Sequence, residues 1–281
     1  MADRADAHIH LFEGGYQGGS FASRPGVSID EAACYASLMD DYGVTAALVV
    51  GYAGAPWCAR NSEFLVKEMA THDWIRPAAH VEPGEGLTPD VLDEFCAKGF
   101  VGLTMYVSGD DQTAALSRVP KATWARCVER NCLVSVNAKG DDWLAWRPIL
   151  ERTPDLRLIL SHCGLPPAVS DPPDAEAARS VLASVTGLAD YPGPRVKLSG
   201  FYALTDPRWD YPHRAAWPYV EALVAAYGVD RLLWASDFTP CLNWLSFPQT
   251  LGLFQHMPFL TAEEREAVEG GNLLKLLEEV R

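Results

Sequence analysis

Two histidines near the start of the chain have the spacing of a paired chemical site. In the segment DAHIH, His8 and His10 are two residues apart, and on a β-strand such residues point to the same face. Two more candidates follow apolar runs later in the chain: His162 after LRLILS and Asp237 after RLLWAS. Three imidazoles and a carboxylate can hold a divalent metal, or can activate water and polarise a carbonyl without one. The chemistry indicated is hydrolysis or a related acid–base reaction.

These four residues need a scaffold that brings the ends of distant strands together. Short apolar runs alternate with helix-like segments along the whole chain. This is the pattern of parallel strands that are covered on both faces by crossover helices. We predict eight strands, over residues 5–10, 45–52, 76–81, 101–106, 132–137, 156–161, 195–199 and 231–236.

Several of the predicted helices carry sequence signals at their ends. Ser28 has the position of an N-cap, with Glu31 three residues later as in a capping box. Gly43 follows the same helix, where a left-handed residue commonly ends one. The helix of the segment TPDVLDEFCAKG begins at Thr88 or Asp90 and is followed by a glycine.

Eight strands joined by helical crossovers predict an α/β fold, either a (β/α)8 TIM barrel or a large doubly wound sheet. No GxGxxG follows the first strand, so the main reason to prefer a dinucleotide-binding sheet is missing. No linker or repeat divides the chain, and we expect one barrel domain over residues 1–281. In a closed barrel strands eight and one are neighbours, so Asp237 can reach what His8 and His10 hold.

Composition limits the possible partners. The formal net charge of −14 argues against nucleic acid and anionic membranes, because both are repelled by a negative protein. We find no apolar run of membrane-spanning length and no signal-peptide pattern, and expect a cytoplasmic protein that acts on a small molecule. The seven cysteines form no CxxC pair and are expected to be reduced, with Cys163 beside the site. The sequence leaves open whether the chain forms a homo-oligomer.

The ordered set of motifs resembles the amidohydrolase superfamily, in its amidohydrolase-related (amidohydrolase-2) branch. The resemblance covers nearly the whole chain and rests on DAHIH, LSHCG, VKLSGFYAL, DRLLWASDFTP and GGNLLKLL. It implies a (β/α)8 fold and hydrolysis, decarboxylation or a related reaction of small carboxylated or cyclic substrates. It also implies that His8 and His10 match first-strand metal ligands, His162 the sixth-strand histidine and Asp237 the eighth-strand aspartate.

One departure from the family pattern concerns the metal. The fifth strand usually ends in a metal-binding histidine, whereas LVSVNAKG offers Asn137, and an amide oxygen is a weak zinc ligand. The lactone hydrolases of this branch are the nearest match, and some of them work without a metal. The sequence thus leaves open whether a divalent ion, zinc or manganese, is held by His8, His10, Asp237 and His162.

We interpret the chain as a hydrolase of a small cyclic ester or a related carboxylated substrate, with Asp237 as the general base. Without a metal, His8, His10 and His162 would polarise the substrate carbonyl and stabilise the oxyanion. The alternatives are metal-dependent decarboxylation, lactone isomerisation and a catalytically silent binding barrel. Asn137 counts against decarboxylation, which in this family depends on a firmly held metal.

Loops after the strands supply candidates for substrate contact. These are Trp57, Arg60, Tyr106, Asn137, Tyr202, Asn243 and Trp244. Arg60 would recognise a carboxylate or else be a surface charge, and His80 could replace the missing fifth-strand ligand. Asn272 in GGNLLKLL is expected to cap the last helix.

Overall fold

The computed structural model describes residues 3–18 and 28–280. In it, eight parallel strands form one sheet, and each strand pairs with the next along the chain. The strands are β1 (Arg4–Ile9), β2 (Val44–Val50), β3 (Ile75–His80), β4 (Gly102–Tyr106), β5 (Leu133–Asn137), β6 (Arg157–Leu160), β7 (Arg195–Leu198) and β8 (Leu232–Trp234). All eight predicted strands are confirmed, and their ends differ from the prediction by at most two residues.

The sheet closes between its first and last strands. A parallel bridge joins Ile9 of β1 to Phe238, just beyond β8. The backbone N–H of Asp237 donates to the carbonyl of His8 at 2.9 Å. The fold is therefore a (β/α)8 barrel, and the doubly wound alternative is wrong because an open sheet has no such closing contact.

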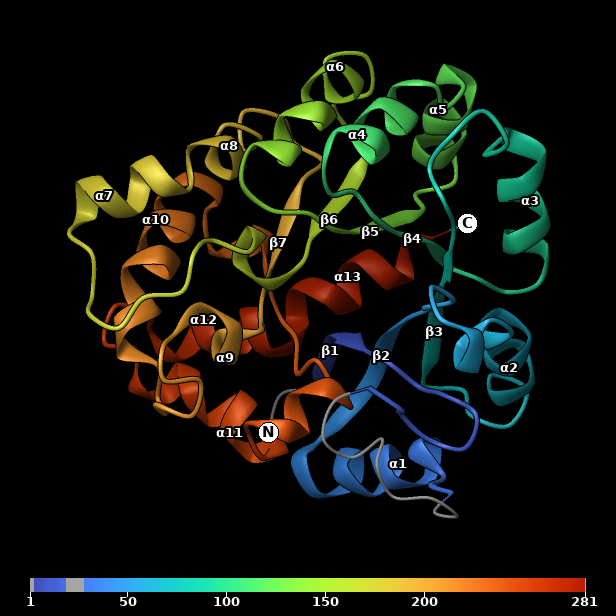
Figure 1. Ribbon diagram of the computed structural model, residues 1–281. Coiled ribbons are helices and arrows are strands. Elements are labelled where there is room, and N and C mark those ends of the chain that lie inside the picture. Colours follow the sequence, from blue (N-terminus) through green and yellow to red (C-terminus); the bar gives the residue numbers. More distant parts are fainter. Residues whose placement is uncertain (1–2, 19–27, 281) are drawn as a thin grey trace.

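Helices surround the strands as an outer ring (Figure 1). They are α1 (Glu31–Tyr42), α2 (Asn61–Glu68), α3 (Pro89–Ala97), α4 (Asp110–Ser117), α5 (Lys121–Glu129), α6 (Arg147–Leu150), α7 (Ala175–Val181), α8 (Ala183–Thr186), α9 (Phe201–Leu204), α10 (Trp217–Tyr227), α11 (Phe247–Gly252), α12 (Ala262–Glu266) and α13 (Asn272–Glu278). A large apolar core fills the space between strands and helices. No described helix combines the length and the apolarity that a membrane crossing requires.

The start of α1 differs from the prediction. Asp30, not Ser28, is the N-cap, and its carboxylate accepts from the N–H of Ala33 at 2.9 Å. Glu31 makes no capping box, because its buried carboxylate accepts from the N–H groups of Phe12 and Tyr16 in the loop after β1. The predicted end is confirmed: Gly43 has φ 67° and closes the helix.

Helix α13 covers the N-terminal end of the barrel and crosses the ring of strands in Figure 1. Its Leu273 and Leu276 pack in one cluster with small strand residues such as Ala5 and Ala46. The prediction that Asn272 caps the last helix is wrong, because a continuous helix leads into α13 with Gly271 at the N-cap position. Its amide instead donates to two carbonyls at the start of β8, each at 2.9 Å.

Candidate active site

The two histidines of β1 lie side by side at the C-terminal end of the barrel. Their Nε2 atoms are 3.0 Å apart, and both side chains are buried. Their other ring nitrogens face different groups: Nδ1 of His10 lies 2.7 Å from the carbonyl of Val50, and Nδ1 of His8 lies 3.1 Å from Nζ of Lys197. A carbonyl only accepts, so neutral His10 carries its proton on Nδ1 and turns an unprotonated Nε2 to the site.

Asp237 reaches the histidines from the end of the last strand. The chain turns there through φ 61°, a conformation that is uncommon for a non-glycine residue and often marks functional sites. The Oδ1 atom lies 3.6 Å from Nε2 of His8 and 3.9 Å from Nε2 of His10. The other oxygen, Oδ2, accepts a hydrogen bond from the hydroxyl of Tyr202. One carboxylate oxygen is thus fixed and the other faces the site.

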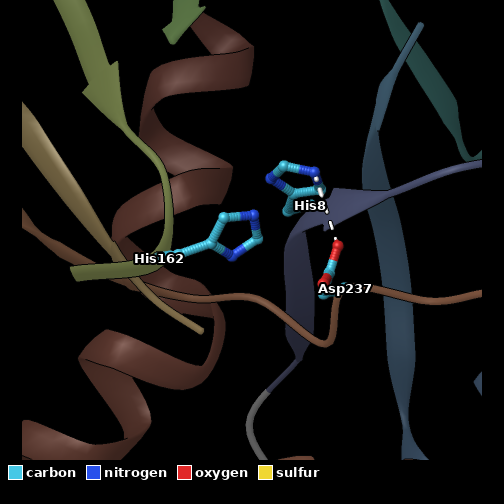
Figure 2. Close-up of side chains that lie close together, drawn as sticks. All are labelled: His8, His162 and Asp237. Carbon is cyan, nitrogen blue, oxygen red and sulfur yellow. Dashed lines mark ion pairs between the residues drawn. The ribbon is translucent and has the colours of Figure 1, made fainter. Parts of the chain in front are cut away.

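His162 completes the group and is directed at His8 and Asp237 (Figure 2). It follows β6 with φ 54°, and its Nδ1 lies 2.9 Å from Oγ of Ser199. The next residue, Gly200, has φ 66°, and a Cβ there would lie 2.8 Å from Nδ1 of His162. Glycine is needed at this position because the backbone and the imidazole approach so closely.

Burial dominates the electrostatics of these groups. It lowers the pKa of His10 to about 4 and that of His162 to about 3, and lowers the pKa of His8 well below its ordinary value. Burial also raises the pKa of Asp237, an effect that the nearby His10 opposes. At neutral pH the three imidazoles are neutral, and the carboxylate is a stronger base than an exposed one.

The same donor set fits a divalent metal. One ligand atom each from His8, His162 and Asp237 lies within 4.8 Å of the others. The triangle of His8 Nε2, His10 Nε2 and Asp237 Oδ1 has edges of 3.0, 3.6 and 3.9 Å. Tetrahedral zinc ligands lie roughly 3.3 Å apart, since each is about 2 Å from the ion. Neutral imidazoles with one carboxylate also suit Zn²⁺ chemically.

A pocket of about 310 Å³ opens beside His10. It is lined by His10, Phe12, Tyr16, Gly18, Tyr52, Ala55, Trp57, Tyr106 and Pro240. Its aromatic walls are packed together, with ring centroids 4.7 Å apart for Phe12 and Trp57, and 5.2 Å for Tyr52 and Tyr106. Such walls suit a small molecule with a flat or apolar face, because aromatic rings stack on such faces.

The predicted substrate contacts fall into different places. Trp57 and Tyr106 line the pocket. Tyr202 is not part of the pocket lining, and its hydroxyl donates to the carboxylate of Asp237. Asn137 ends β5, and in the barrel its register partner is Tyr106. His80 packs its ring 6.0 Å from that of Tyr106 and is not in the group of potential metal ligands.

Three predicted contacts and one cysteine lie away from the pocket lining. Arg60 is exposed and forms an ion pair with Glu63, its neighbour on the same surface. Trp244 is 36% exposed, and Oδ1 of Asn243 is buried without a hydrogen-bond partner. Cys163 is buried, which raises the pKa of its thiol to about 12, so it is a poor nucleophile.

Lys197, a fully buried lysine in β7, was not among the predicted site residues. Its Nζ lies 3.1 Å from Nδ1 of His8 and donates to Oγ of Ser135 at 2.7 Å. Burial lowers its pKa to about 7. The signal was present in RVKLSG, because Lys197 and Ser199 share one face of a strand whose other face carries Val196 and Leu198. A lysine is almost never fully buried unless it is paired.

A family model described as amidohydrolase, that of the amidohydrolase-2 family, matches residues 5–278. The chain therefore belongs to this family. It is an enzyme of the amidohydrolase superfamily.

Individual relatives match the chain either over a short segment or at low sequence identity. An L-fucono-1,5-lactonase of Burkholderia ambifaria is 32% identical over 87 residues, 31% of this chain and 28% of that protein. An uncharacterized protein, y4mH, of Sinorhizobium fredii is 36% identical over 85 residues, 30% of this chain and 26% of that protein. The chain thus matches only about a quarter of the length of either curated relative. An amidohydrolase of Burkholderia multivorans with bound zinc has a TM-score of 0.78 at 19% identity, covering 99% of this chain and 100% of the other. A probable 2-pyrone-4,6-dicarboxylic acid hydrolase of Acinetobacter baumannii with bound citric acid has a TM-score of 0.73 at 16% identity. The match covers 98% of this chain and 99% of the other. At such identities these structures support the fold alone.

Proposed function

We propose that the chain hydrolyses a small cyclic ester and that Asp237 is the general base. The observation that carries the proposal is the geometry of the Asp237 carboxylate. Tyr202 holds Oδ2, while Oδ1 faces the Nε2 atoms of His8 and His10 at 3.6 and 3.9 Å. Burial raises the pKa of Asp237, which favours proton transfer from water.

The reaction can be followed through the protein's own groups. Oδ1 of Asp237 takes a proton from water, and the water oxygen attacks the ester carbonyl carbon. A ring N–H from His8 or His162 donates to the oxyanion that forms. The ring C–O bond then breaks, and Asp237 returns its proton to the departing oxygen, so the product is a hydroxy acid.

The pocket and the relatives support a ring-shaped substrate. Its aromatic walls offer flat apolar surfaces directly beside His10. A relative is named an L-fucono-1,5-lactonase and a structural neighbour a probable pyrone dicarboxylic acid hydrolase, and both names describe cyclic esters. We propose the same bond type for this chain.

A divalent metal is compatible with this proposal. His8, His10, His162 and Asp237 would hold it, with Trp57 and Tyr106 left free to contact substrate. A bound ion would supply Lewis acidity at the carbonyl or the water. The zinc bound in the Burkholderia multivorans amidohydrolase supports such a site.

The test is a panel of five- and six-membered lactones, with release of acid measured by a pH indicator. We expect acid release with at least one lactone, and a kcat lower on the order of 10³-fold for Asp237→Asn, the scale of general base catalysis. Asp110→Asn, at the exposed start of α4, is the matched control and should leave kcat unchanged. Near-normal turnover of Asp237→Asn would show that another group is the base.

The same panel separates the alternatives. Consumption of a lactone without acid release would indicate isomerisation, because no water is added. Release of carbon dioxide from a carboxylated ring would indicate decarboxylation. Either result would replace hydrolysis as the function of this site.

A further inference from the structure

Lys197 contacts His8 at Nδ1, whereas Nε2 of the same ring faces His10. The side chain is 0% exposed and contacts two groups on other strands, Oγ of Ser135 on β5 and Nδ1 of His8 on β1. These two hydrogen bonds need only two N–H groups. An ammonium and a free amine both have them, so the contacts do not require one charge state.

A chain of hydrogen bonds determines where His8 carries its proton. The carbonyl of Val50 accepts from Nδ1 of His10, which leaves Nε2 of His10 as an acceptor. Nε2 of His8 lies 3.0 Å from that acceptor, so His8 must supply the proton between them. A neutral imidazole has only one N–H, so Nδ1 of His8 is unprotonated and accepts from Lys197.

This arrangement is the reverse of what supports a metal-binding histidine. A ligating imidazole almost always donates its second N–H to a carbonyl, a carboxylate or water. His10 has such a partner in Val50, whereas His8 faces an amino group that donates. With a metal on its Nε2, a neutral His8 would carry its proton on Nδ1 and could no longer accept from Nζ of Lys197, 3.1 Å away.

We propose that Lys197 is a positioning residue that holds His8 in its Nε2–H form and so weakens metal binding at the site. The two histidines of DAHIH then differ in role. In the structure the Nε2–H of His8 donates to Nε2 of His10. A substrate oxygen that displaces this contact would accept from His8 and leave the lone pair of His10 for water. The hydrogen-bond geometry carries this inference, and it does not depend on which substrate the enzyme takes.

The tautomers can be read directly from ¹⁵N NMR of the imidazole nitrogens in metal-free protein. The His8 and His10 signals are assigned by their loss in His8→Gln and His10→Gln. We expect His8 to be protonated on Nε2 and His10 on Nδ1. A His8 protonated on Nδ1 would overturn the proposal, and this measurement on the unaltered protein needs no variant of Lys197 to fold.

The second test measures zinc affinity with a chromophoric chelator as competitor. Lys197→Met has a similar volume and removes the donor, and we expect zinc to bind tenfold or more tightly, within the 10–100-fold range of outer-shell changes. Ser135→Ala is the matched control, because it removes the other partner of Lys197 and leaves the contact with His8. Equal affinity in Lys197→Met, Ser135→Ala and unaltered protein would refute the proposal. Neither measurement uses the lactone assay, so the proposal and the proposed hydrolysis can fail separately.

Discussion

The two ends of the barrel differ in the polarity of their buried side chains. At the C-terminal end, buried histidines surround Asp237, and the backbone has positive φ at His162 and Asp237. At the N-terminal end, Leu273 and Leu276 of α13 pack on small apolar residues of the strands. Strain and buried polar groups destabilise a fold, and apolar burial stabilises it. Apolar packing at the N-terminal end therefore stabilises the fold and offsets the cost of the polar site at the C-terminal end, while the chemistry itself is confined to the latter.

The largest effect is expected for Leu273→Ala, in helix α13 at the apolar N-terminal end of the barrel. Leu273 is 1% exposed, and removing such a side chain leaves a cavity that lowers the free energy of unfolding by about 3 kcal/mol. We expect this loss in urea denaturation, with kcat on the reactive lactone unchanged. A drop in kcat of more than a few-fold would mean that the two ends are not independent.

Gly200→Ala tests the reactive end with the next largest effect. A Cβ there would lie 2.8 Å from Nδ1 of His162, and φ is 66°, so the imidazole must shift. Displacements of about 1 Å in an active site can lower kcat by 10²-fold. The measurement is kcat beside the urea midpoint.

Gly43→Ala is the matched control for Gly200→Ala. Gly43 has nearly the same φ, 67°, but a Cβ there meets nothing within 4 Å. Both variants should lose about 1 kcal/mol of stability from the left-handed backbone. Only Gly200→Ala should lose activity, and equal kcat values in the two variants would contradict the close approach to His162.

Much of this architecture could be predicted because it depends on local patterns. Strands such as β2 and β6 are apolar on both faces, so each forms a nearly continuous apolar run in the sequence. His8 and His10 share a face because the strand period is two. The position of Asp237 followed from the order of strands in a closed barrel.

The missed features depend on contacts between distant segments. The role proposed for Lys197 depends on its contact with Nδ1 of His8, which is 189 positions away in the chain. Glu31 has the spacing of a capping-box residue, but N–H groups of Phe12 and Tyr16 bind its carboxylate. The aromatic walls of the pocket likewise combine loops after several strands. No local pattern predicts which distant group satisfies a polar side chain.

The smallest predicted effect concerns His213, in the loop that follows β7 at the reactive end. Its Nδ1 lies 2.6 Å from Oγ1 of Thr205, and Nε2 is buried with no hydrogen-bond partner among the residues that the structure describes. Burial lowers its pKa to about 4, against the opposing charge of Asp210. Between the ordinary pKa near 6.5 and this value, the unfolded chain binds the proton and the folded chain does not. The free energy of unfolding therefore falls as pH drops through this window, by about 1.4 kcal/mol per pH unit at most.

His213→Asn isolates that dependence. Asparagine tolerates the positive φ of 58° at this position and keeps a polar group for Thr205, but does not titrate. Urea denaturation at pH 4.5, 5.5 and 6.5 should show that the stability difference between the two proteins shifts in favour of the variant as pH falls. Parallel profiles would mean that His213 takes up its proton in the folded state as well. In that case the reactive end would tolerate a buried charge, and its contrast with the apolar end would be smaller than the packing indicates.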